Sequence, residues 1–435
     1  MSSKSIIKTF FLASVLLLGT FSCQKEELEL PDSPEKVLLM YAAGFNSLSS
    51  YIKEDINDVI NNEYIPAKNE DILLIFSKTT ISGYANQTAP TLTRIYLDKM
   101  GAIVRDTLLH YPKGTIAASA ETLHDVLTYI NRCYPDCSYG MVFSSHCTGW
   151  LPNGYYANPS YYENSASGMR MARQSVNELP HDAVPFFEPI EEDPNLPAVK
   201  SIGQEVGSVD GVSVSYEMEL NEFVAAIPMF LDYIIFDDCY MGGVEVAYAM
   251  RNVCGYIGAS QTEVIADGFD YSKLTSNLLQ PTKASPEGFC RDYFNFYSNQ
   301  TRAEMRSATI SLINCGNMES LVEVCRSLND KYRASLATLR PNQVQGYYRH
   351  NRHFFFDLED IYAKAGANES DLSELRAALD RCIAYKAATS SFLSSFDIEV
   401  YSGMSMYIPS TYCGTPYLDS HYLNLDWNRA TGLVL

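Results

Sequence analysis

A histidine and a cysteine each follow a short apolar run that has the length of a buried strand. The run 140–145 leads into His146, and the run 233–236 leads through two acidic residues into Cys239. A thiol at the start of a helix lies at the positive end of the helix dipole, which favours the attacking thiolate. A neighbouring imidazole can carry the proton and pass it to a leaving amine. The pair predicts nucleophilic catalysis, and a buried structural cysteine with a hydrogen-bonded structural histidine is the alternative.

These two residues can meet only if a sheet brings the two runs together. Apolar runs alternate with stretches of helical periodicity, one of which begins at a predicted N-cap, Ser119. Continuous apolar strands are typical of a parallel sheet covered by helices, so the sequence predicts an α/β fold with a mostly parallel sheet. Sites in such sheets gather beyond the carboxyl ends of the strands. The predicted strands are Lys36–Ala43, Asp71–Phe76, Tyr139–Ser145, Asp232–Phe236 and Gly255–Ala259, with a looser pair at Thr93–Leu97 and Ile103–Leu109.

The pattern changes near residue 272. Helical periodicity dominates the stretches 285–299, 317–339 and 371–388, without comparable strands between them, and strand-like alternation returns at Ile398–Pro409. We therefore expect a core over residues 36–271 and a mainly helical C-terminal region, residues 272–435, that closes on it.

The composition excludes one class of partner. The chain has 435 residues, 46% of them hydrophobic, and 52 acidic against 32 basic residues give a net charge of −20. The hydrophobic fraction is high enough for a large buried core. Because nucleic-acid binding needs clustered Lys and Arg to neutralise phosphates, we expect no nucleic-acid partner.

The first residues have the layout of an export signal. Lys4 and Lys8 precede an apolar run, Phe10 to Leu18, that is too short to span a bilayer. Residues 1–22 are therefore predicted to be a cleaved signal peptide.

Cys23 stands at the predicted cleavage point. A cysteine directly after such a run resembles the lipidated first residue of a bacterial lipoprotein, and Gln24-Lys25-Glu26-Glu27 resembles the tag that sends lipoproteins of Bacteroidota to the outer surface. Residues 23–35 would then be a lipidated tether in the outer membrane, and the protein would face the cell surface. Plain secretion with cleavage nearby is the alternative.

The other ten cysteines do not have the spacing of a disulfide framework. Most lie in apolar segments and are expected to be small buried hydrophobic residues. Cys133 and Cys137 form a CxxxC pair without a second pair or a flanking histidine, so zinc binding is not expected. The sequence is compatible with either a local disulfide between them or two free thiols.

Several local sequences together resemble the clostripain family of cysteine peptidases. The segment 235–271 has the family's Asp-x-Cys-x-Met pattern followed by Glu, and SSHCTGWLP from Ser144 resembles its histidine segment. Matches run from about residue 36 to 410 and are strongest over 139–151 and 231–272. The individual residues are Tyr41, Ala42, Ala43, Asn46, Leu48, Asp237, Cys239, Met241 and Glu245, with SGMSMYIP from Ser402 resembling a late strand.

The resemblance implies a caspase-like α/β/α sandwich in which Cys239 is the nucleophile and His146 its partner. The backbone N–H groups of Cys147 and Cys239 would hold the oxyanion. Asp237 matches the acidic residue of the first specificity pocket, where a carboxylate favours Arg or Lys. The other interpretation of Asp237 is an acid at a helix N-terminus. The implied substrates are proteins or peptides with Arg or Lys at the cleaved bond.

Two residues depart from the family pattern. Cys147 stands where the family usually has glycine, and a required positive φ there would strain the backbone. Asp238 replaces a small residue, and its charge would raise the pKa of the Cys239 thiol. The alternative function is therefore a catalytically inactive clostripain-like surface lipoprotein that acts as a binding protein.

Family members are often made as zymogens that are cut after a basic residue between the histidine and cysteine segments. The candidates in this chain are Arg170, Arg173 and Lys200, and Lys200-Ser201 is our first choice because core-like sequence resumes just after it. The alternative is an ordinary exposed loop. The chemistry requires no metal or other cofactor, although calcium is possible because family members can depend on it.

Overall fold

The structure of the protein is a computed structural model. It describes residues 34–43, 47–61, 64–82, 86–166, 183–185, 187, 193–200, 205–209, 212–279 and 284–435. The predicted signal peptide 1–22, the lipidation site Cys23 and most of the tether 23–35 lie outside these residues, as do Arg170 and Arg173. Within them, no helix combines the length and the apolar character needed to cross a bilayer.

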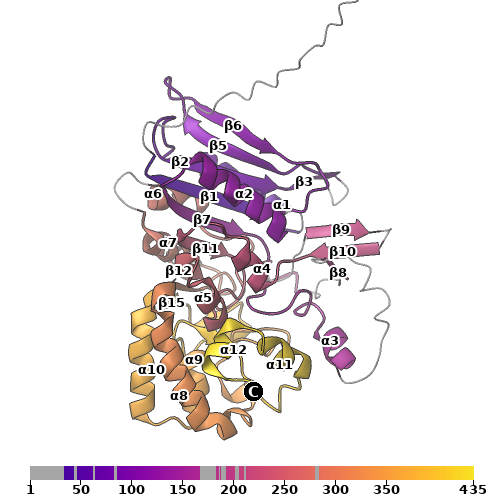
Figure 1. Ribbon diagram of the computed structural model, residues 1–435, viewed down its shortest axis with the longest axis vertical. Helices are drawn as coiled ribbons and strands as arrows, with labels where there is room; N and C mark the ends of the chain where they lie inside the picture. The colour runs from indigo at the N-terminus through magenta and orange to yellow at the C-terminus, as the bar shows by residue number, and fades with distance from the viewer. Residues whose placement is uncertain are drawn as a thin grey trace, which may run out of the picture.

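A nine-stranded sheet crosses the molecule (Figure 1) in the order β15-β13-β12-β11-β7-β1-β2-β5-β6. The five strands β12, β11, β7, β1 and β2 are parallel, and both edges are antiparallel. This confirms the predicted α/β fold, since the central runs are buried almost without interruption. The strands are β1 Lys36–Ala43, β2 Ile72–Lys78, β5 Thr91–Leu97, β6 Ile103–His110, β7 Ser138–Ser144, β11 Leu231–Asp237, β12 Cys254–Ala259, β13 Thr309–Asn314 and β15 Ile383–Ala388.

Helices cover the sheet in two rows. One row is made by α2, α4 and α5, and the other by α1, α6 and α7, with the turn Tyr271–Lys273 between α1 and α6. Right-handed crossovers place α1 and α2 on opposite faces, because β1-to-β2 and β6-to-β7 cross the sheet in opposite directions. The Ser119 side chain accepts from Thr122 N–H, which confirms the predicted N-cap. The helices are α1 Ser49–Ile60, α2 Ala120–Cys133, α4 Leu220–Ala225, α5 Val244–Met250, α6 Leu274–Leu278 and α7 Pro286–Ser298.

The last third of the chain contributes strands as well as helices. β13 lies between the first two predicted helical stretches, and residues 383–388 form strand β15 rather than the end of a helix. Pairing with β13 outweighs the helical periodicity there. The predicted strand at 398–409 is reduced to Ser405–Met406. In Figure 1, α8 and α10 pack side by side next to α9, α11 and α12. Their bounds are α8 Met318–Leu336, α9 Leu358–Lys364, α10 Glu369–Cys382, α11 Pro416–Tyr422 and α12 Asp426–Thr431.

A small three-stranded sheet lies beside the main sheet (Figure 1), in the order β8-β10-β9. It belongs to the long segment that separates the predicted histidine and cysteine sites. Its strands are β8 Ala183–Pro185, β9 Glu205–Val209 and β10 Val212–Tyr216, preceded by helix α3 Pro159–Ala166. The other short pairs are β3 Thr80–Ser82 with β4 Asn86–Gln87, β14 Phe356–Asp357 with β18 Ser405–Met406, and β16 Ser391–Phe392 with β17 Phe396–Asp397.

Two tyrosines near the C-terminus, Tyr407 and Tyr422, contact the loops that follow β7 and β11. The Glu245 carboxylate, at the start of α5, accepts hydrogen bonds from Tyr407 N–H at 3.1 Å and from the Tyr422 hydroxyl at 2.6 Å. Trp150, beyond β7, packs on the same two rings with centroids 5.0 and 4.9 Å away. The C-terminal region thus fixes both loops against each other.

Candidate active site

His146 and Cys239 lie just beyond the carboxyl ends of two neighbouring strands, at the same edge of the sheet. β7 and β11 are neighbours in parallel, with Ser144 paired to Asp237. Each reactive residue lies two positions beyond one member of this pair, so the register brings the two loops side by side. Cys239 is fully buried, and His146 is 9% exposed.

The nucleophile loop is not the start of a helix. α5 begins at Val244, five residues after Cys239, and the intervening backbone returns to the sheet through Gly242 N–H bonded to Ser260 O. The prediction that the helix dipole favours the thiolate is therefore wrong for this form of the chain. Asp237, as the last residue of β11, is likewise not an acid at a helix N-terminus.

The Cys239 thiol lies in a dry environment that holds it protonated. Val264 N–H donates to its Sγ at 3.1 Å. Burial, followed by the nearby Glu263 carboxylate, raises the pKa of Cys239 well above its usual range. Glu263 is itself buried in a two-pronged ion pair with Arg349, with N···O distances of 2.5 and 2.9 Å.

His146 is held neutral by the same burial. Its Nδ1–H donates to the carbonyl oxygen of Lys200, and its Nε2 lies 3.4 Å from the Ser47 hydroxyl. Burial lowers the pKa of His146 to about 3, against the opposing effect of the bond to that carbonyl. Both members of the predicted dyad are therefore uncharged in the uncut chain.

The two departures from the family pattern are accommodated. Cys147 is not among the described non-glycine residues with positive φ, so a side chain at this position causes no left-handed strain. Asp238 is fully buried and accepts from Ser145 N–H at 2.7 Å. Burial, and then the charge of Asp237, raise the pKa of Asp238 to about 8. At neutral pH Asp238 is therefore mostly protonated and adds little negative charge beside the thiol.

The Asp237 side chain is completely buried, and the space around it that the Lys200 side chain occupies is called the Asp237 pocket below. Asp237 Oδ2 accepts from the Tyr271 hydroxyl at 2.7 Å and the Ser144 hydroxyl at 3.1 Å, and it is ion-paired with the Lys200 ammonium. Lys200 is completely buried. Burial acts to lower the pKa of Lys200, but Asp237 and Asp55 more than offset it and the net shift is upward.

The backbone around Lys200 lies along the nucleophile site like an added strand. Lys200 N–H donates to Val264 O, and Ala266 N–H donates to Ala198 O, both at 2.8 Å. Val199 forms an antiparallel bridge with Ile265. The Lys200 side chain thus fills the Asp237 pocket while its carbonyl oxygen faces the His146 imidazole. The segment ending at Lys200 is not an ordinary exposed loop.

Sequence reasoning missed several residues that shape this pocket. Gly268 has φ +67°, and a Cβ there would lie 2.7 Å from Asp237 Oδ2. Asp55, on α1, is 5% exposed with no partner for its Oδ2, and burial raises its pKa to about 8. A carboxylate in register with the buried Ile52 and Val59 was a detectable signal for a buried acid. Tyr271 lay within the recognised segment without a distinguishing pattern.

The structure also bears on the state of the CxxxC pair and on metal binding. Cys133 and Cys137 are both free thiols. Over the described ranges, no group of three or more His, Cys, Asp or Glu side chains has a metal-binding arrangement.

Comparisons with known proteins agree with this architecture. The model of the clostripain family matches residues 40–172 and 191–412. An inactive zymogen C11 protease from Parabacteroides distasonis is 25% identical, with a TM-score of 0.70 over 92% of this chain and 99% of that one. A secreted C11 cysteine protease from Bacteroides thetaiotaomicron, solved with an irreversible peptide inhibitor, is 21% identical with a TM-score of 0.66 over the same shares. These likenesses confirm the caspase-like fold. A search of curated proteins gave no match.

The buried acids predict how stability depends on pH. In the uncut chain Asp238 keeps its proton up to about pH 8, whereas in the unfolded chain it loses it near pH 4. Between these values the folded state binds the extra proton, so the free energy of unfolding falls as pH rises, by up to about 1.4 kcal/mol per pH unit. We expect Asp238→Asn to flatten the fall in melting temperature between pH 5 and pH 8. The exposed Asp397→Asn serves as control, and parallel curves for both variants would contradict the assignment.

Proposed function

The chain belongs to the clostripain family of cysteine peptidases, and we propose that it is an endopeptidase with Cys239 as nucleophile and His146 as proton carrier, cutting after Lys or Arg. The observation that best supports this proposal is the position of Lys200, whose ammonium group pairs with Asp237 while its backbone N–H donates to Val264 O, as those of a bound basic substrate would. Lys200 is itself a basic residue of the kind that the Asp237 pocket is proposed to prefer.

The proposed chemistry has two stages. The Cys239 sulfur attacks the carbonyl carbon, and the N–H groups of Cys147 and Cys239 stabilise the oxyanion. His146 carries the thiol proton to the leaving amine, the C–N bond breaks, and a thioester remains. Water then attacks the thioester, releasing the acid product and restoring the thiol. Every atom that reacts comes from the chain, the substrate or water.

Specificity for a basic residue follows from the charge of the pocket. Asp237 meets the ammonium group, with the Ser144 and Tyr271 hydroxyls as further partners of the same carboxylate. Charge-assisted hydrogen bonds of this kind are about twice as strong as neutral ones. An acidic or apolar side chain in the pocket would leave Asp237 buried and unpaired, which is costly.

We also propose that cleavage after Lys200 activates the enzyme. As long as Lys200 occupies the pocket, no other substrate can reach Asp237. Hydrolysis of the bond to Ser201 would release the Lys200 carbonyl from His146 and let the new chain end leave the pocket. The alternative, an inactive binding protein, was suggested by Cys147 and Asp238, and both residues fit the site without strain or added charge.

Peptide cleavage tests the nucleophile and the pocket. On coumarin-amide peptides ending in Lys, Arg, Asp or Leu, we expect cleavage after Lys and Arg only. Cys239→Ala should reduce it at least about 1,000-fold, because no other group can form the acyl intermediate. Asp237→Asn should reduce kcat/KM by about 10- to 100-fold, the loss of one bond to a charged group. Activity retained in Cys239→Ala, or equal cleavage after Leu, would refute the proposal.

Self-cleavage tests activation. Intact mass should show a cut after Lys200 at a rate independent of protein concentration, because Lys200 already lies in the pocket, and no cut in Lys200→Ala. Gly268→Ala should slow the cut, since its Cβ would overlap Asp237 Oδ2 and the Lys200 ammonium. Gly414→Ala is the matched control, with φ +64° and open space around the added carbon. Equal slowing in both variants would show that backbone strain, not the pocket, is responsible.

For the location of the enzyme, we propose the lipid anchor predicted from the first 23 residues. The pattern of charge, apolar run and cysteine supports it. Cells expressing the protein with a labelled fatty acid should incorporate label at Cys23 and lose it in Cys23→Ala, with the protein then appearing in the medium. An unlabelled wild-type protein in the medium would favour plain secretion.

A further inference from the structure

A partly enclosed cavity opens beside His146, and Asp237 is not among the residues that line it. It has about 820 Å³ of space free of atoms, part of it open to solvent. Its lining includes His146, Cys147, Ala118 and Tyr216. The basic side chain of the proposed substrate does not use this space.

The chain direction relates this cavity to the leaving-group half of a substrate. If the cleaved bond follows Lys200, that half begins at the His146 imidazole. After Lys200, the next described residue is Glu205, which pairs with Tyr216 in the small sheet and accepts from Ala118 N–H at 3.0 Å. Thus the chain is anchored at two points, Lys200 and Glu205. One partner of Lys200, His146, lines the cavity, and so do two partners of Glu205, Ala118 and Tyr216.

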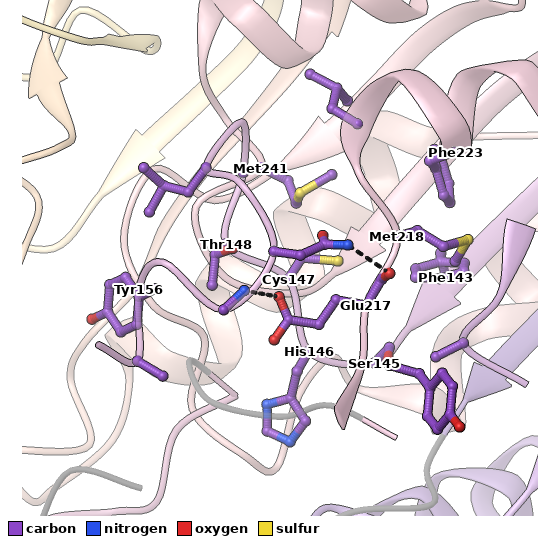
Figure 2. A pocket seen from close by; sticks show the side chains of 18 residues that line it. Phe143, Ser145, His146, Cys147, Thr148, Tyr156, Glu217, Met218, Phe223 and Met241 are labelled. Carbon is purple, nitrogen blue, oxygen red and sulfur yellow. Dashed lines mark hydrogen bonds between the residues drawn. The ribbon is translucent and has the colours of Figure 1, made fainter. Parts of the chain in front are cut away.

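The walls of the cavity are mainly apolar. In Figure 2, Met241 lies above Cys147, and Met218 lies beside Phe143 and Phe223 on the right of the view. Such surface gains free energy by covering an apolar side chain and loses it by covering a charged one.

One acid sets the charge preference. Glu217 is the only carboxylate among the described residues that line the cavity, and Gly154 N–H donates to its Oε2 at 2.8 Å. An acidic substrate residue would meet like charge there as well as apolar walls. The sequence after the proposed cut, Ser201-Ile202-Gly203-Gln204, has an apolar residue at its second position and no acid.

We propose that this cavity is a subsite for an apolar substrate side chain on the leaving-group side, within the first two residues after the cleaved bond. The inference rests on the proposed endopeptidase function and adds a second determinant of specificity to it. The enzyme would then select a basic residue followed closely by an apolar one, and it would reject acidic residues after the cut.

The test compares two kinds of substrate on the processed enzyme. Internally quenched peptides carry Lys and then Ile, Leu, Gly or Asp at the first or second following position, whereas a Lys methyl ester has only a methoxy group there. We expect kcat/KM at one of these positions to be about 10-fold or more higher for Ile or Leu than for Asp. Met218→Ala should reduce this preference several-fold, and Glu217→Gln should selectively improve the Asp peptides. Neither variant should alter hydrolysis of the Lys methyl ester.

The controls separate the possible failures. Met305→Ala truncates another half-buried methionine, one that does not line the cavity, and should leave the preference unchanged. If Met218→Ala unfolds, Glu217→Gln alone decides the charge preference, because it keeps the shape of the side chain. A flat profile in the wild type, or a preference that both cavity variants preserve, overturns the subsite. If neither substrate type is cleaved, the proposed function fails and this inference fails with it.

Discussion

The buried ion pair between Lys200 and Asp237 is the interaction on which the uncut structure depends. Both side chains are completely excluded from solvent, and removing two charges from water costs several kcal/mol per ion unless their mutual attraction and further hydrogen bonds compensate. The Ser144 and Tyr271 hydroxyls supply those bonds, and the Asp55 carboxyl adds a favourable field at Lys200. Because withdrawing Lys200 would leave Asp237 buried without its counter-ion, the pair holds the chain in its substrate-like position.

The same closure explains why neither reactive group is charged before cleavage. Burial is the largest influence on both, raising the pKa of Cys239 and lowering that of His146 to about 3. Proton transfer from thiol to imidazole inside this dry site would create two charges where water cannot solvate them. Departure of the Lys200 segment would admit solvent and bring both pKa values closer to their ordinary range. Occlusion of the pocket and suppression of the thiolate thus have one common cause.

The sequence predicted what depends on local pattern and failed where long-range contacts decide. Continuous apolar runs predicted the central strands, and their parallel order brought His146 and Cys239 together. β15 was mistaken for the end of a helix, because an edge strand that pairs on one side keeps an ambiguous pattern. The prediction that a helix dipole acts on Cys239 was wrong because a turn follows β11, and α5 begins only five residues after Cys239. Asp55 comes from a distant helix, so its place in the pocket follows only from the fold.

Asp238 and Cys147, the two residues that depart from the family pattern, interact with each other through their side chains. Asp238 lies on the nucleophile loop, and its Oδ1 accepts from Ser145 N–H on the histidine loop, so the carboxyl joins the backbones that carry His146 and Cys239. The raised pKa of Asp238 lets it form this link largely without a charge, and the neighbouring Cys147 thiol interacts with the same carboxyl. A small residue at position 238 would remove this hydrogen bond and leave the pairing of β7 with β11 and the Ser144–Asp237 hydrogen bond. The Asp238 link therefore adds to the strand pairing in holding the two loops together, while Glu245 and Trp150 hold them from the C-terminal side through Tyr407 and Tyr422.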